Sequence, residues 1–219
     1  MQSGMLILSD LYTFVRKHRT WPTEAMRIDG LSLLGKEYSD ICRDTVATVP
    51  IVRGLYLWGF YNGNGFWTNI YIGKAGQKKT SSLHNRLYKE LTAERACIWR
   101  EVLTIEELEK TGAEIHPRMW PKYIHHWHRA FEKTGTTHIA WIALPEIEEA
   151  NIEPIENDLI EAMNPTGNRK RTKPPEDFRD DTKRVFGQLR KVINARAHRE
   201  TRFPLEVHRD FWKETLSNA

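Results

Sequence analysis

The sequence has no long apolar run and few cysteines. No stretch of about 18 apolar residues occurs in it, so a membrane-spanning helix is not expected. Residues 1–20 lack the charged head, apolar run and small-residue cleavage site of a secretory leader. Cys42 and Cys97 lie far apart and belong to no CxxC motif, which argues against a disulfide framework or a zinc ribbon. These absences predict a soluble, cytoplasmic protein without a membrane partner.

The length of the chain limits its organisation. A chain of 219 residues, 40% of them hydrophobic, can bury one sizeable core but is short for two full domains. We therefore expect one domain with elaborations.

Positive charge is concentrated in one part of the chain. The net charge is +4, but residues 169–199 alone hold eleven Lys or Arg against four Asp or Glu, so the remainder is net negative. A basic segment beside such a body suits a polyanion, because each neutralised phosphate releases counterions. A solvated helix with no partner is the alternative interpretation of the same charge.

The apolar pattern predicts strands in the middle of the chain and helices around them. Residues 5–17 and 31–42 have apolar side chains at helical spacing. Residues 45–61 are rich in β-branched and aromatic residues, an Asn-Gly-Asn-Gly turn follows, and residues 66–75 form the returning strand of a predicted hairpin. Further along, we expect a helix over 82–102, a strand over 137–144, and helices over 149–163 and 178–197.

Two short motifs on the predicted hairpin resemble the two halves of the GIY-YIG nuclease signature. They are Gly54-Leu55-Tyr56 on the first strand and Tyr71-Ile72-Gly73-Lys74 on the second. Arg86 follows in the next helix, Glu156 begins a Glu-x-x-Leu-Ile stretch, and Pro165-Thr166-Gly167-Asn168 matches a Pro-x-x-Asn motif. The resemblance depends on the order of these elements, because either short motif alone would carry little information.

The resemblance implies an α+β fold, with a small three-stranded antiparallel sheet flanked by helices. The domain organisation that it implies comprises an N-terminal helical extension over 1–50, a catalytic domain over 51–168 with an insertion at about 95–135, and a basic C-terminal helical extension over 169–219.

The resemblance also implies a magnesium-dependent endonuclease. The implied catalytic residues are Tyr56, Tyr71, Lys74, Arg86, Glu156 and Asn168. Glu156 would bind one Mg²⁺ per active site, since a carboxylate with waters and a substrate phosphate suits this ion. Arg86 would hold the scissile phosphate through its guanidinium fork. Tyr56 or Tyr71 would orient or deprotonate the attacking water, which for a phenol requires that a nearby cation lower its pKa.

Some positions leave the interpretation open. Some members of the family place a histidine one helical turn after the arginine, and this position is Glu90 here. His84 and Tyr88 lie nearby as unproven substitutes in proton transfer. Asn168 has three possible roles: it positions a phosphate, positions a strand end, or stops a helix.

The expected partner is double-stranded DNA. One active site per chain implies that a homodimer on DNA, or sequential nicking, cuts both strands. We expect the insertion and the basic segment to read bases and hold the backbone. The candidate DNA-binding residues are Lys74, Lys78, Lys79, Arg169, Lys170, Arg171 and Lys173.

Other interpretations compete with these. The cluster of His116, His125, His126 and His128 has metal-like spacing but no cysteine or acidic partner, so an aromatic and basic surface is preferred there. Tryptophans 58, 67 and 141 are expected in the core.

Three hypotheses compete for the function. A restriction-like enzyme is the first, a repair or recombination nickase the second, and a non-catalytic DNA-binding protein the third.

Overall fold

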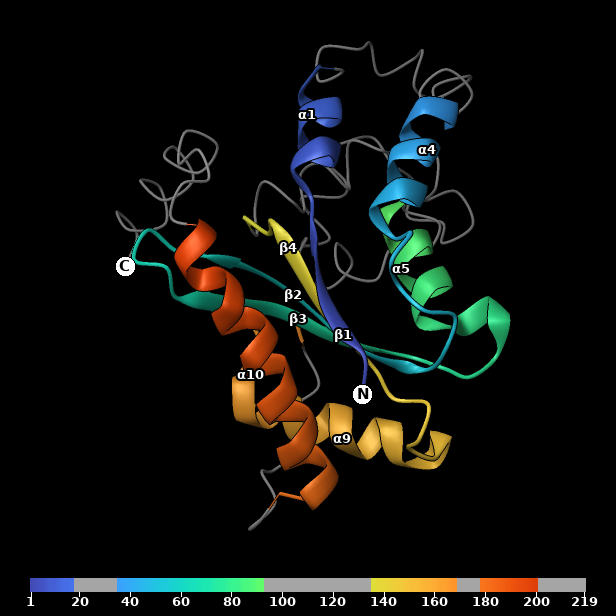
Figure 1. Ribbon diagram of the computed structural model, residues 1–219, viewed down its shortest axis with the longest axis vertical. Coiled ribbons are helices and arrows are strands. Elements are labelled where there is room, and N and C mark those ends of the chain that lie inside the picture. The colour runs from blue at the N-terminus through green and yellow to red at the C-terminus, as the bar shows by residue number, and fades with distance from the viewer. Residues whose placement is uncertain (18–34, 93–134, 169–177, 201–219) are drawn as a thin grey trace, which may run out of the picture.

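The computed structural model describes residues 1–17, 35–92, 135–168 and 178–200, in which helices cover both faces of a four-stranded antiparallel sheet (Figure 1). The elements in chain order are β1 (Ser3–Ile7), α1 (Ser9–Lys17), α4 (Gly35–Thr45), β2 (Gly54–Tyr61), β3 (Trp67–Ala75), the short 3-10 helix η1 (Lys79–Ser81), α5 (Leu83–Leu91), β4 (His138–Ala143), α9 (Glu149–Met163) and α10 (Asp180–Glu200).

The strands lie in the order β1-β4-β2-β3, so β4 and β2 are central and β3 is an edge. Every residue of β4 is buried, and all of β2 except Tyr61 is buried. Strands covered on both faces need apolar side chains on both, which explains why these segments are continuous apolar runs without alternation. The predicted third strand over 137–144 is confirmed as β4.

The predicted hairpin is confirmed, since β2 and β3 pair antiparallel along their length. At its tip the Asn62 side chain accepts hydrogen bonds from the backbone N–H groups of Asn64 and Phe66, both at 3.0 Å. Gly65 has a φ of 77°, a left-handed conformation that glycine adopts at little cost. Asn62 and Gly65 therefore fix the turn, and the turn fixes the register of the two strands.

A β-bulge interrupts the hairpin at one point. Trp58 pairs with Tyr71, but the next residue, Gly59, pairs with Asn69, so Ile70 is the extra residue on β3. Ile70 and Tyr71 both pack on the core that contains Tyr56. Bulges re-aim side chains in this way. The bulge thus adds Ile70 to the face of the sheet on which Tyr56 lies, whereas Tyr71 is on that face through its pairing with Trp58.

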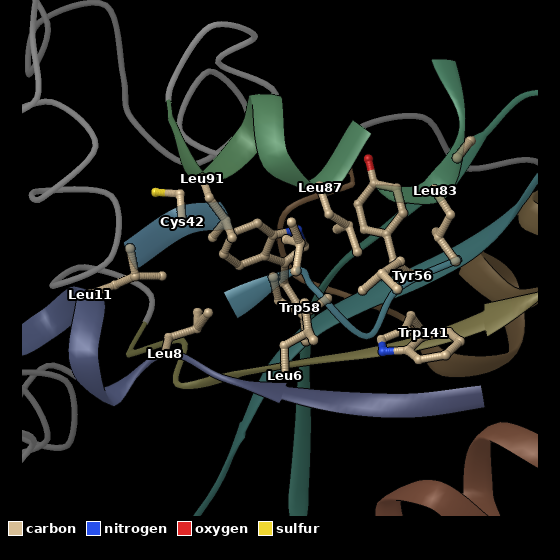
Figure 2. Close-up of a cluster of buried hydrophobic side chains, with 14 of the residues drawn as sticks. Leu6, Leu8, Leu11, Cys42, Tyr56, Trp58, Leu83, Leu87, Leu91 and Trp141 are labelled. Carbon is tan, nitrogen blue, oxygen red and sulfur yellow. The ribbon is translucent and has the colours of Figure 1, made fainter. Parts of the chain in front are cut away.

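Each face of the sheet has its own hydrophobic core. Helices α1, α4 and α5 cover one face, while α9 and α10 cover the other (Figure 1). In the first core, Trp58 lies in the middle of leucines from β1, α1 and α5, and the hydroxyl of Tyr56 points toward α5 (Figure 2). The sheet therefore separates the environment of Tyr56 from that of α9.

The expectation of three strands is wrong, because β1 adds a fourth that pairs with β4. We expected a helix from residue 5, but Met5, Leu6 and Ile7 are in β1, and α1 begins only at Ser9. The unpaired edge of β4 offers hydrogen bonds to this segment, and that gain does not appear in the local apolar pattern. The N-terminal extension is therefore part strand and part helix.

The other helical predictions agree with the described residues. Helix α5 begins where expected but ends at Leu91, and the expected residues 93–102 lie outside the described residues. Helices α9 and α10 occupy the expected segments, and α9 is capped by Asn164, whose φ of 44° is left-handed, just before Pro165. Within the described ranges, no helix has the length and apolarity needed to span a membrane. The predicted insertion, except for Gly135, and the basic residues 169–177 lie outside the described residues.

Candidate active site

The end of β3, the loop after it, α5 and the first turns of α9 enclose a cleft of about 300 Å³. Its polar lining includes Lys74, Arg86, Lys89, Glu149 and Glu153. These residues come from segments far apart in the sequence. The cleft lies where helices from the two faces of the sheet approach each other around the end of β3.

Tyr56 and Gly73 face each other across the hairpin. A Cβ atom at Gly73 would overlap the Tyr56 ring, with its Cε2 atom only 2.8 Å away. The absence of a side chain at Gly73 therefore lets the phenol lie across β3. The ring of Tyr71 is tilted by 45° to that of Tyr56, with centroids 6.3 Å apart. Both tyrosines of the motif are thus on one face, with Tyr56 buried and Tyr71 half-buried.

Arg86 lies in the first turns of α5 and reaches Tyr56. The helix is capped by Ser82, whose hydroxyl accepts from the backbone N–H of Asn85. The Nε atom of Arg86 lies 3.2 Å from the Tyr56 hydroxyl and 2.9 Å from Oε1 of Glu90. Arg86 also lines the cleft, with its side chain 20% exposed. It therefore connects the buried phenol with the cleft.

Glu90 is a buried partner of these groups that the sequence analysis did not assign to the site. It accepts hydrogen bonds from the Tyr56 hydroxyl at Oε1 and from Trp58 Nε1 at Oε2, the latter at 3.1 Å. Burial raises the pKa of its carboxyl, while Arg86 and the donated hydrogen bonds oppose this rise. The sequence did indicate that Glu90 is buried, because it shares the apolar face of α5 with Leu83, Leu87 and Leu91.

Lys74 and Glu156 meet on the other face of the sheet. Lys74 Nζ lies 2.7 Å from Glu153 and 3.5 Å from Glu156, whose side chain is only 14% exposed. Burial raises the pKa of Glu156, and the charges of Lys74 and Arg86 oppose this rise. Arg86 lies on α5 and Lys74 on β3, so charges from two elements act on this carboxyl of α9.

Asn168 binds the edge strand with both polar groups of its side chain. Its Oδ1 accepts from the Ile72 backbone N–H at 2.8 Å, and its Nδ2 donates to the Ile72 carbonyl at 2.9 Å. The N–H of Gly167 donates to the Ile70 carbonyl at 2.6 Å. Among the three roles considered for Asn168, this geometry matches the positioning of a strand.

Of the remaining candidates for DNA binding and proton transfer, some lie among the described residues and others lie outside them. Lys78 and Lys79 are exposed on the loop beside the cleft, while Arg169, Lys170, Arg171 and Lys173 lie outside the described residues. His84 Nδ1 is 3.1 Å from the Val49 carbonyl, and Tyr88 packs against the first core.

The three tryptophans expected in the core lie among the described residues, whereas the four clustered histidines do not. Trp58 and Trp141 are core residues as predicted, and Trp67 on β3 is half-buried. The four histidines of the suggested metal cluster are outside the described residues. In the described ranges, no three His, Cys, Asp or Glu side chains are grouped so that they could hold a metal ion.

Comparison with known proteins gives no further information about the roles of these residues. The chain matches no protein-family model, no curated protein and no solved structure.

Proposed function

We propose that this protein is a magnesium-dependent endonuclease of the GIY-YIG type that hydrolyses phosphodiester bonds in double-stranded DNA. The observation that carries the proposal concerns Tyr56, Arg86 and Glu156: Arg86 lines the cleft and contacts Tyr56, and Glu156 pairs with Lys74, which also lines the cleft. Tyr56, Arg86 and Glu156 come from β2, α5 and α9, which are well separated in sequence. Their order along the chain is the order that the resemblance requires.

The cleft is lined by three cations and two glutamates, and the cations suit a phosphodiester. Lys74, Arg86 and Lys89 line the cleft, and exposed Lys78 and Lys79 lie on the adjoining loop. Hydrolysis of a phosphodiester develops negative charge on the phosphate oxygens, which preorganised cations stabilise. A guanidinium can hold two of these oxygens at once. Arg86 is therefore assigned to the scissile phosphate, with the lysines binding the strand on either side.

Glu156 fits a magnesium ion. Its carboxylate is a hard oxygen donor, mostly buried, whose charge Lys74 compensates in part and a bound cation would compensate further. Magnesium keeps several waters and is commonly held by one or two carboxylates together with substrate phosphate, so a single protein carboxylate is sufficient. When bound, the ion supplies Lewis-acid stabilisation of the phosphate charge. Glu156 would hold it, and Lys74 would keep the carboxylate ionised.

The two tyrosines have different surroundings. Tyr71 is half-buried, whereas the buried Tyr56 is hydrogen-bonded to Arg86 and Glu90. Glu90 accepts the hydrogen bond of the Tyr56 hydroxyl, and this carboxylate partner favours Tyr56 as the group that takes a proton from the attacking water. Tyr71 would then orient that water.

The biological role that we propose is restriction-like cutting at a specific site. A cleft with one set of these residues per chain cuts one strand, so cutting of both strands calls for a homodimer on DNA or for sequential nicking. A repair nickase would instead leave single-strand nicks without a shared sequence.

Point variants test the proposal. Glu156→Ala and Arg86→Ala should each lower Mg²⁺-dependent cutting of plasmid DNA by about 10²-fold or more, since each removes a charge that acts on the transition state. Glu37→Ala, which changes an exposed glutamate on α4, is the matched control and should cut like the parent. Equal cutting by all the variants would contradict the assignment of the site.

A further inference from the structure

Glu90 is the most completely buried acidic group among the described residues, with a side-chain exposure of 0%. A buried charge is costly unless hydrogen bonds and an opposite charge compensate it. Here Arg86 from α5 supplies the opposite charge, and Tyr56 and Trp58 from β2 donate hydrogen bonds. Two of these three partners belong to the proposed active site.

The two carboxylate oxygens of Glu90 have different partners. Oε2 accepts from the indole N–H of Trp58, a core residue, and this contact fixes the plane of the carboxylate. Oε1 accepts from the Tyr56 hydroxyl and from Arg86 Nε. Trp58 in the core therefore fixes the orientation of the carboxylate, and Oε1 contacts the two residues of the proposed site.

We propose that Glu90 is a positioning residue that accepts the hydroxyl proton of Tyr56 when Tyr56 takes a proton from the attacking water. The inference rests on the proposed nuclease function and adds to it the group that makes Tyr56 a competent base. An ordinary phenol ionises only near pH ~10, so at neutral pH it needs an acceptor for its own proton.

The proton and bond changes balance in one relay. The attacking water forms a bond from its oxygen to phosphorus and gives one proton to the oxygen of Tyr56. Tyr56 gives its own proton to Oε1 of Glu90 and stays neutral. The bond from phosphorus to the leaving oxygen breaks, and solvent protonates that oxygen. After product release, Glu90 returns its proton through Tyr56 to solvent.

The surroundings of Tyr56 are consistent with this path. Its hydroxyl is buried but lies against Arg86, which lines the cleft. The ring of Tyr71 on β3 covers its other side. Two charged groups thus contact the phenol: Arg86, which also lines the cleft, and the buried Glu90.

The pH profile of Glu90→Gln tests the relay. Parent cutting should level off with rising pH once Glu90, the internal acceptor, is ionised. In Glu90→Gln the Tyr56 proton must be lost to solvent first, so cutting should fall by about 10²-fold at neutral pH and rise about tenfold per pH unit toward alkaline pH. Glu90→His should recover part of the loss, with a half-maximal rate near pH ~6.5.

Several outcomes separate the relay from a structural role. Circular dichroism and thermal unfolding check that each variant folds, and Glu37→Gln is the control for loss of an acid. A folded Glu90→Gln with the parent's rate and pH profile would overturn the role of Glu90 alone. So would carbon-13 NMR of labelled glutamate carboxyls showing Glu90 protonated at the pH of cutting. A parent protein that cuts no DNA would contradict the proposed function itself.

Discussion

At the scale of single residues, the position of the Tyr56 ring depends on the absence of a side chain at Gly73. The Tyr56 ring occupies the space that a Cβ atom at Gly73 would need. Gly73→Ala should therefore displace the phenol, lower the stability by about 1–3 kcal/mol through overpacking, and reduce cutting. Gly63→Ala at the hairpin tip is the control, because a Cβ there meets no atom within 4 Å. Urea unfolding and a cutting assay measure both effects, and equal behaviour of the two variants would contradict the packing argument.

Glu156 gives a prediction about pH. Burial raises the pKa of its carboxyl, so the group takes up a proton at a higher pH than an exposed glutamate does. The ionised form is the one that binds Mg²⁺, and cutting should therefore be lost as the pH falls through this raised pKa. Because Mg²⁺ and the proton compete, more Mg²⁺ should move the acid half-point of cutting to lower pH. A half-point that is independent of Mg²⁺ would show that Glu156 is not the ligand.

Some residues of the candidate site could be predicted from the sequence, and Glu90 could not. Tyr56, Arg86 and Glu156 were selected by motif order; in the structure Arg86 lines the cleft and contacts Tyr56, and Glu156 pairs with Lys74. Glu90 was missed because the resemblance offered a histidine at that position, and only His84 and Tyr88 were considered as its substitutes. The apolar face of α5 did contain the signal, since an acid at a core position needs a partner. That partner, Tyr56, is 34 positions away and could not be read from local spacing.

At the scale of elements, Asn168 protects the edge of β3. Its two hydrogen bonds satisfy both backbone groups of Ile72, as a neighbouring strand would. Asn168→Ala should lower the free energy of unfolding by about 1–3 kcal/mol, because buried backbone groups lose their partners. Asn151→Ala, at an exposed position of α9, is the control. A loss of cutting without a loss of stability would instead indicate contact with the phosphate.

Asp158 joins α9 to α10. Its Oδ2 accepts from Arg179 and from Thr182, both at 2.7 Å, and its side chain is 7% exposed. Asp158→Ala should lower the stability by about 1–3 kcal/mol, because two donors lose their acceptor, one of them on the buried Thr182. Asp40→Ala removes an exposed pair with Arg43 and should shift the melting temperature less. Equal shifts in the two variants would contradict this role of Asp158.

Elements with strong local signals were predicted, and one that depends on distant pairing was not. The hairpin follows from its Asn-Gly turn and β4 from its apolar run, because each signal is contained in a few residues. The β1 segment is short, and its apolar residues fit a helix and a strand equally well. Its state is decided by the edge of β4, more than 130 residues later in the chain. Nonlocal pairing of this kind is invisible to a local pattern.

At the scale of the whole molecule, charge and topology are consistent with a nucleic-acid partner. The sheet holds the tyrosines on one face and Lys74 on the other, and the cleft at the end of β3 collects groups from both sides. The positive charge that favours association with a polyanion is concentrated in residues 169–199, which hold eleven Lys or Arg against four Asp or Glu. The proposed homodimer would place two such clefts on the two strands of one duplex.

The most direct test is incubation of the purified protein with unmethylated plasmid or phage DNA, with Mg²⁺ and with a chelator, followed by sequencing of the ends. We predict discrete fragments that appear only with Mg²⁺ and share a short palindrome. Nicks without a shared sequence would contradict the restriction role while leaving the chemistry in place. DNA that stays intact under all conditions would contradict the central claim that this cleft hydrolyses phosphodiester bonds.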